Sequence, residues 1–244
     1  MKKLSWTTGI LVCLMVLFAA LGAVCGAVDQ MARDAHFYGD MSRAAVAKYL
    51  NTQDEAQVTD YIGLDAAQQG EFAAQMAAFM AGETDAQPEV LNADEQQHMI
   101  DVRNLTQTAA GMSKTYLYIA VVLAVAAAWT GARLERRALP KLAGALAAAT
   151  IAAGLACIVI SRIAGGGFAD LFVQMHEMIF TNDLWLMDPA KDILIRMMPQ
   201  PLFEQALANG AGHALRMFVI VCVMLIAVHE IVQRMIRRHV TKGE

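Results

Sequence analysis

Two histidines beside apolar residues, each with a carboxylate nearby, are the side chains of this sequence best suited to chemistry. His98 precedes Asp101 by three positions, and His176 is followed by Glu177 and later by Asp188. An ordinary imidazole pKa near 6.5 leaves histidine mostly neutral at pH 7, which suits a general base. The competing interpretation is a packed histidine with a satisfied hydrogen bond. We treat both histidines as candidate catalytic residues.

The stretch that begins near His176 combines polar and aromatic residues. Its polar members could support the histidines or orient a headgroup, or could simply pair at the surface, where ion pairs contribute little: Asn182, Asp188, Asp192 and Arg196. Its aromatic members could line a substrate pocket, or could only anchor the chain at headgroup level: Phe180, Trp185 and Phe203.

Other catalytic arrangements lack one of their required residues. His176-Glu177 and His229-Glu230 begin like HExxH, but Phe180 and Gln233 stand where the second zinc ligand would be. No serine lies in a GxSxG elbow. The glycine run 165–167 has no P-loop lysine, so we interpret it as a hinge. The sequence predicts neither a metal nor a cofactor.

Composition places these residues in a membrane protein. Apolar residues make up 57% of the 244 residues and the mean hydropathy is +0.41, above the range of ordinary soluble domains. Four apolar runs approach or exceed the roughly 20 residues that span a bilayer. The four cysteines lie in or beside these runs, so no disulfide framework is expected: Cys13, Cys25, Cys157 and Cys222.

Lysine and arginine positions predict the orientation, because they favour the cytoplasmic side. They occur before the first run, between the second and third, and after the fourth. We expect residues 1–28 to hold a cytoplasmic N-terminus and a first span, retained rather than cleaved as a signal peptide, with further spans at 116–132, 142–160 and 213–233. Segments 29–115 and 161–212 then form an extracytoplasmic cap, while the loop 133–141, the tail 234–244 and both termini are cytoplasmic. No basic surface for nucleic acid remains.

The cap is expected to be mainly helical. Asp40 could cap a helix through Leu50, followed by a connection over 51–60. A helix is predicted from Asp65 to Ala81, because Phe72, Met76 and Phe79 recur on one helical face.

A further helix should begin at Ala93, after the capping-box spacing of Asn92 and Glu95. If it continued straight to Tyr116, His98 would stand about 27 Å before that residue. That distance is too large for chemistry at the lipid surface. If His98 acts on a lipid, we therefore expect a break within 106–111, where threonine and glycine weaken helices. Asp188-Pro189 predicts another short helix, ending near Met198.

Two blocks of residues resemble the bacterial lipoprotein intramolecular transacylase (Lit) family. One runs Asn92-x-x-Glu95-x-x-His98-Met99-x-Asp101-Val102-Arg103-x-Leu105. The other runs His176-Glu177-x-x-Phe180-x-Asn182-x-x-Trp185-x-x-Asp188-Pro189-x-x-Asp192-x-Leu194-Ile195-x-x-x-Pro199-x-x-Phe203. Met175 and Ile179 depart from the aromatics expected there.

The resemblance implies a four-span enzyme of the bacterial cytoplasmic membrane that acts, among membrane lipids, on a diacylated lipoprotein. It would move the sn-2 acyl chain to the α-amino group of the N-terminal cysteine without a cofactor. His98 and His176 would divide proton transfer and oxyanion stabilisation. Asp101 and Asp188 would orient the imidazoles, Asn182 would donate to the oxyanion, and Phe180 and Trp185 would line the acyl pocket. Two alternatives stay open: a non-catalytic cap that binds a lipoprotein or transporter, and a metal-dependent membrane hydrolase.

Overall fold

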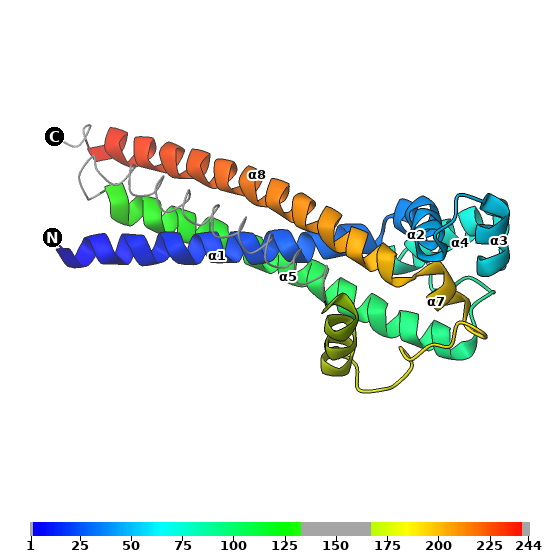
Figure 1. Cartoon of the computed structure of the whole chain (residues 1–244). Coiled ribbons are helices and arrows are strands. Elements are labelled where there is room, and N and C mark those ends of the chain that lie inside the picture. The colour runs from blue at the N-terminus through cyan, green and yellow to red at the C-terminus, as the bar shows by residue number, and fades with distance from the viewer. Residues whose placement is uncertain (1, 133–166, 241–244) are drawn as a thin grey trace. The chain divides into compact units, whose positions relative to one another are not determined.

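The computed structural model describes residues 2–132 and 167–240, and these form helices and turns without a strand (Figure 1). The predicted all-α class is therefore confirmed. The predicted third span at 142–160, the loop 133–141, Cys157 and most of the glycine run lie outside the described residues.

The described residues fall into two compact units. The first comprises 2–27, 110–132 and 211–240, and the second comprises 28–109 and 167–210. Three long helices contribute residues to both: α1 (Lys2–Ala32), α5 (Ala93–Ala132) and α8 (Gln200–Val240). Each unit has a hydrophobic core of its own.

The first unit packs small residues of α1 and α5 against each other. Ala19 and Ala23 of α1 are buried with Ala120 and Ala124 of α5. The hydroxyl of Ser113 donates a 2.8 Å hydrogen bond to the carbonyl of Gly22. A Cβ on Gly22 would lie only 3.3 Å from the backbone oxygen of Ser113, so this approach requires a glycine or a small shift of the neighbouring helix.

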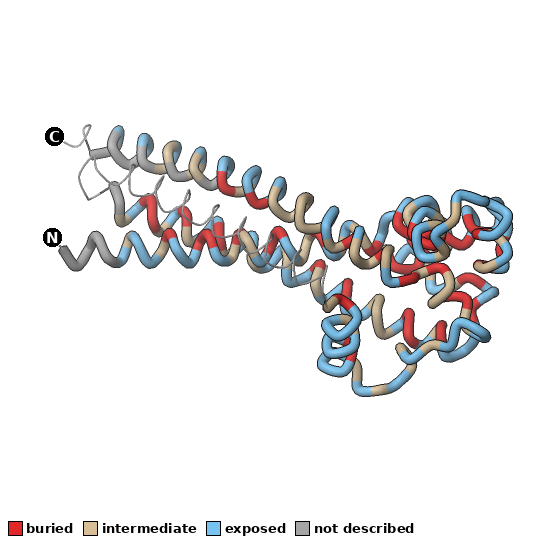
Figure 2. The backbone as a smooth tube through the Cα atoms, viewed as in Figure 1, coloured by how far each residue is buried: buried red, intermediate tan, exposed pale blue. Residues whose placement is uncertain are grey.

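The outward faces of these helices are apolar. Leu17 of α1, Val122 of α5 and Val223 of α8 are among many large apolar side chains that are about half exposed. Figure 2 shows exposed residues recurring along these helices. Three described stretches are long and apolar enough to cross a membrane: Thr7–Ala32, Ala93–Thr130 and Gln200–Val232. An apolar exterior matches hydrocarbon as the surrounding medium.

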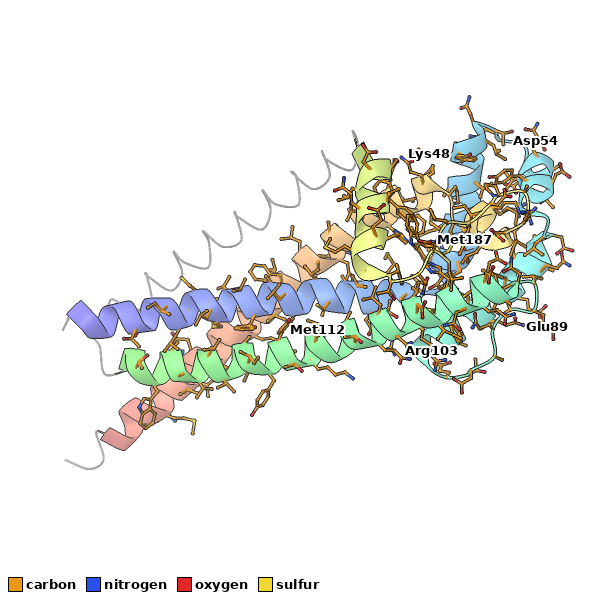
Figure 3. All side chains as sticks on the ribbon, turned by 90° about the horizontal axis from the view of Figure 1, so that it is seen from below. Lys48, Asp54, Glu89, Arg103, Met112 and Met187 are labelled. Carbon is orange, nitrogen blue, oxygen red and sulfur yellow. The ribbon has the colours of Figure 1, made fainter. Side chains whose placement is uncertain are left out.

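The second unit gathers short helices around a separate core. Its elements are η1 (Phe37–Met41), α2 (Ser42–Leu50), α3 (Glu55–Ile62), α4 (Ala66–Ala81), a helix over 167–179 and α7 (Ile193–Met197). Val46, Ile62 and Met76 are fully buried in its core, together with Met197 from the far end of the sequence. Figure 3 shows Met187, which packs against the same core.

Two predicted helices of this unit are confirmed. Asp65 and Gln68 form a complete capping box ahead of α4, whose Phe72, Met76 and Phe79 are buried. Helix α5 begins at Ala93, as predicted. The side-chain oxygen of Asn92 accepts from the backbone amides of Asp94 and Glu95, at 3.0 Å each.

The start of α2 and the connection after it were predicted wrongly. Asp40 does not cap α2; its carboxylate lies 3.0 Å from the imidazole of His36, within a π-helical turn that precedes α2. The stretch 51–60 is not merely a connection, because Asp54 accepts from the Ala56 amide and caps α3. These are local hydrogen-bond choices that hydrophobic periodicity does not report.

The break expected at 106–111 is also wrong, since α5 is one continuous helix. Thr106 and Thr108 donate their hydroxyls to the carbonyls of Arg103 and Asn104. The threonines thus bond to their own helix without interrupting it. His98 accordingly stands about 27 Å from Tyr116 along the helix axis.

The short helix after Pro189 begins later than predicted. Residues 189–191 form a turn, in which the Asp188 carboxylate accepts from the amide of Ala190 at 2.9 Å. Helix α7 starts only at Ile193, after Asp192. Pro201 lies in the first turn of α8, where proline is tolerated because it has no N–H to satisfy.

Candidate active site

The two candidate histidines face each other inside the second unit. His98 lies on α5 and His176 on the helix over 167–179, 78 residues apart in sequence. Their ring centroids are 6.2 Å apart and their planes differ by 27°. Both residues are only 7% exposed. The structure thus brings together two imidazoles in a largely dry environment.

Aromatic side chains surround this pair. Phe180 contacts both imidazoles, with centroid distances of 5.1 Å to His98 and 5.5 Å to His176. Trp185 lies 5.1 Å from His176, and Phe172 lies 4.0 Å from it. Phe203 belongs to a second layer, because its ring packs on Phe172 at 5.1 Å. Phe172 was not among the predicted site residues; its spacing of four residues before His176 on a helix was the signal that could have placed it here.

A backbone contact fixes the tautomer of His176. Its Nδ1 lies 2.7 Å from the carbonyl oxygen of Phe172. A carbonyl only accepts hydrogen bonds, so Nδ1 carries the proton and Nε2 presents a lone pair. In His98, by contrast, Nδ1 is buried without a partner among the described residues. An unpaired buried polar atom is costly unless a ligand satisfies it.

Burial also keeps both rings neutral. His98 lies in the charged first turns of α5, beside Asp101 and Arg103, before the apolar part of that helix begins. Burial, and then the neighbouring His176, lower the pKa of His98 to about 4, although Asp101 opposes this shift. Burial also lowers the pKa of His176, against the opposing effect of the Phe172 hydrogen bond. At pH 7 both imidazoles are therefore neutral.

Asp101 and Asn182 form a polar pair beside the histidines. The Asn182 amide donates a 3.0 Å hydrogen bond to Asp101 Oδ2. The two residues line an open pocket of about 240 Å³. No hydrogen bond joins Asp101 to His98 among the described residues, so Asp101 acts on that ring through its charge and does not hold its orientation.

Glu95 is buried, although the sequence predicted it only as part of a helix cap. It is 1% exposed. Its Oε2 accepts from the Asn92 amide at 2.8 Å, and its Oε1 accepts from the Leu194 amide at 2.7 Å. One carboxylate therefore joins the first turn of α5 to α7. His98 follows one turn later on α5.

Three of the predicted supporting residues lie elsewhere. Asp192 accepts from Asn92 at 2.8 Å and from the amide of Asp188 at 2.6 Å, so both aspartates shape the turn before α7. Arg196 points toward Gly63 at the end of α3. None of the contacts described joins these three side chains to an imidazole.

The helix over 167–179 packs one face against the site, and large apolar side chains on its other faces are exposed. Phe168 and His176 are buried, with Phe172 between them on the same face. Met178 is 81% exposed, and Leu171, Val173 and Ile179 are each 40% exposed.

Within the two described ranges, no three His, Cys, Asp or Glu side chains are grouped as metal ligands would be.

Comparisons with known proteins give one consistent result. The family model described as lipoprotein intramolecular transacylase Lit matches residues 10–203, a range that includes both histidines. No curated protein matches.

Among solved structures, the chain resembles the membrane integral lipoprotein intramolecular transacylase Lit from Bacillus cereus, solved in meso. The TM-score is 0.61 at 17% identity, over 98% of this chain and 100% of that one. A form of that enzyme with a histidine replaced by arginine gives a TM-score of 0.58 at 16% identity, over 98% of this chain and 96% of that one.

Proposed function

Because this chain belongs to the lipoprotein intramolecular transacylase Lit family, we propose that His98 and His176 are the residues that move protons in its acyl transfer. The protein is a membrane-integral transacylase and its substrate is a lipoprotein. The observation that carries the proposal is the pair of buried, neutral imidazoles 6.2 Å apart in an aromatic enclosure.

The reaction moves the sn-2 acyl chain of the diacylglyceryl group to the α-amino nitrogen of the N-terminal cysteine. The neutral amine attacks the ester carbonyl carbon, a C–N bond forms, and the C–O bond to the glycerol breaks. One proton leaves the nitrogen and one reaches the glyceryl oxygen, so the exchange balances without an added reactant. Both groups belong to one molecule, and holding them together can supply as much as about 7–11 kcal/mol.

His176 is the base in this scheme. Its Nδ1–H is committed to the Phe172 carbonyl, so Nε2 is the nitrogen that can take the proton of the attacking amine. The same hydrogen bond stabilises the imidazolium that forms.

His98 is the hydrogen-bond donor to the oxyanion and then the route of the proton to the departing glyceryl oxygen. A neutral imidazole N–H in a dry site can stabilise an oxyanion, as in other enzymes that use neutral histidine. Burial of His98 maintains that neutral form. Its Nδ1 has no hydrogen-bond partner among the described residues, so no contact of this nitrogen there fixes the tautomer of the ring.

The aromatic residues exclude water and hold the lipid portion of the substrate. Phe180 and Trp185 contact the imidazoles directly, and Phe203 supports Phe172 from behind. The exposed apolar side chains of the 167–179 helix, with Met178 the most exposed, suit contact with membrane lipids and acyl chains.

The proposed topology has four spans in the bacterial cytoplasmic membrane, with both termini cytoplasmic and the cap outside. Lysine and arginine beside the apolar runs support it. Packing of α1 against α5 and α8 supports retention of the first span as part of the protein. The diacylated lipoprotein would then meet the site from the outer leaflet.

Mass spectrometry of the N-terminal lipopeptide of a reporter lipoprotein tests the proposal. Expression of this chain in a host that lacks the activity should convert the diacylated form to the lyso form. His98→Ala and His176→Ala should each abolish conversion while the protein still accumulates in the membrane, and His36→Ala, on the exposed surface, should convert normally. Full activity of either site variant would contradict the two-histidine mechanism.

A further inference from the structure

Asp101 is a carboxylate on a pocket wall without a cationic partner in the structure. No lysine or arginine of the described residues pairs with it. The neighbouring Arg103, labelled in Figure 3, instead pairs with Asp85 at 2.9 Å and lies over the ring of Phe79. Asp101 accepts one amide hydrogen bond at 3.0 Å from Asn182 and a long one, 3.4 Å, from Gln97. A carboxylate has capacity for further donors beyond these two.

The pocket beside Asp101 is built for a small cation with an apolar attachment. Its lining combines the Asp101–Asn182 pair with the apolar side chains of Leu105, Ile179 and Phe180. Phe180 contributes an aromatic side chain to this lining, beside the carboxylate.

Phe180 also connects this pocket to the histidine pair. It lines the pocket and contacts both imidazoles, at 5.1 Å and 5.5 Å. Neither imidazole is itself part of the pocket lining. A group held in the pocket is thus separated from the buried histidines by one aromatic side chain.

We propose that Asp101, held by Asn182, binds the α-ammonium group of the lipoprotein's N-terminal cysteine in this pocket. This inference rests on the proposed function, because that amine is the nucleophile of the reaction. An α-amino group has a pKa of about 7.7–8.0, so it arrives mainly as a cation at neutral pH.

In this arrangement the amine binds in the pocket and reacts beside the imidazoles. The pocket, which is open and carries a negative charge, receives the charged amine. The two imidazoles belong to residues that are only 7% exposed, and such dry surroundings disfavour a bare cation and favour the neutral amine. Asp101 thereby concentrates the amine beside the histidines. The ammonium releases one proton to the water of the open pocket, and the neutral amine then attacks the ester.

Two unreactive substrate analogues test the site in the full-length purified protein. Both carry an ether in place of the sn-2 ester; one has the free α-amino group and the other lacks that nitrogen. Their inhibition constants are measured against a reactive ester lipopeptide. Wild-type protein should bind the amino analogue roughly ten-fold or more tightly, as expected for one charge-assisted hydrogen bond.

Asp101→Asn should reduce this preference to about one-fold, because it removes the charge while keeping the shape of the side chain. Asp183→Asn is the matched control, since it removes a charge from an exposed residue of the same loop and should leave the preference intact. In wild-type protein the preference should also decline above the pKa of the amine. The second measurement needs no variant and therefore does not depend on the folding of Asp101→Asn.

Equal inhibition by the two analogues, or an unchanged preference in Asp101→Asn, would overturn the ammonium site. The proposed function has a separate outcome, because wild-type protein that fails to convert the ester lipopeptide would refute transacylation itself. Conversion without analogue preference would reject only the ammonium site.

Discussion

Replacing Glu95 by glutamine should loosen the link between α5 and α7. The carboxylate accepts from two backbone amides, those of Asn92 and Leu194, at 2.8 Å and 2.7 Å. Glutamine has one oxygen and one NH2 group, so one of the two amides must face another donor. The variant thus loses one buried hydrogen bond to a charged group, worth roughly 1.5–3 kcal/mol.

That loss should lower the Tm of the purified protein by about 3–12 °C, given a chain of this size. Amide exchange at Leu194 should accelerate, and mass spectrometry of peptides that cover 193–197 reports it directly. Activity should fall as well, because His98 lies one turn beyond Glu95 on α5. Glu89→Gln is the control: its side chain is exposed in the loop before α5 (Figure 3).

This role of Glu95 is refuted if Glu95→Gln and Glu89→Gln have Tm values within about a degree of each other and Leu194 exchanges at the wild-type rate. That result would mean that the buried carboxylate contributes nothing that an amide cannot replace. A Tm loss without a change at Leu194 would place the effect at the α5 cap alone, where about 1 kcal/mol is expected.

Two further predictions concern pH and backbone conformation. Burial lowers the pKa of His98 to about 4. Between that pH and about 6.5 the unfolded chain therefore binds more protons than the folded protein. The free energy of unfolding should fall by roughly 3 kcal/mol as the pH drops through this window. His98→Gln should flatten the denaturation midpoint plotted against pH, and an unchanged slope would exclude this imidazole as the cause. Gly63 has φ of +81°, so Gly63→Ala should destabilise by about 1–2 kcal/mol. Gly70→Ala, inside α4 with nothing within 4 Å, should stabilise by about 0.5–1 kcal/mol; equal Tm shifts in the two variants would contradict the assignment of strain to Gly63.

Local sequence was enough to predict the elements whose ends are set by neighbouring residues. The capping box at Asp65 and the cap at Asn92 each use side chains within three positions of the amides they satisfy. The burial of Phe72, Met76 and Phe79 follows from their spacing on one helical face. In these cases the interacting groups are close together in the chain, so their spacing is enough to predict the helix start and the buried face.

Local sequence misled where competing short-range bonds were possible. Thr106 and Thr108 can either disrupt a helix or donate to the carbonyl one turn back, and here they do the latter. Asp40 could cap α2 but pairs with His36. Residue type alone does not choose between such alternatives of similar energy.

The sequence by itself determined the all-helical membrane class, the family, and the two histidines as candidates, because hydrophobic run length, motif spacing and residue chemistry are properties of the chain. Only the tertiary structure decided which groups meet. It places the imidazoles of His98 and His176 6.2 Å apart and pairs Asp101 with Asn182 across 81 residues. It also places the Arg196 guanidinium beside Gly63. Such contacts depend on the packing of elements distant in sequence, where burial of apolar surface, and not local spacing, selects the partners.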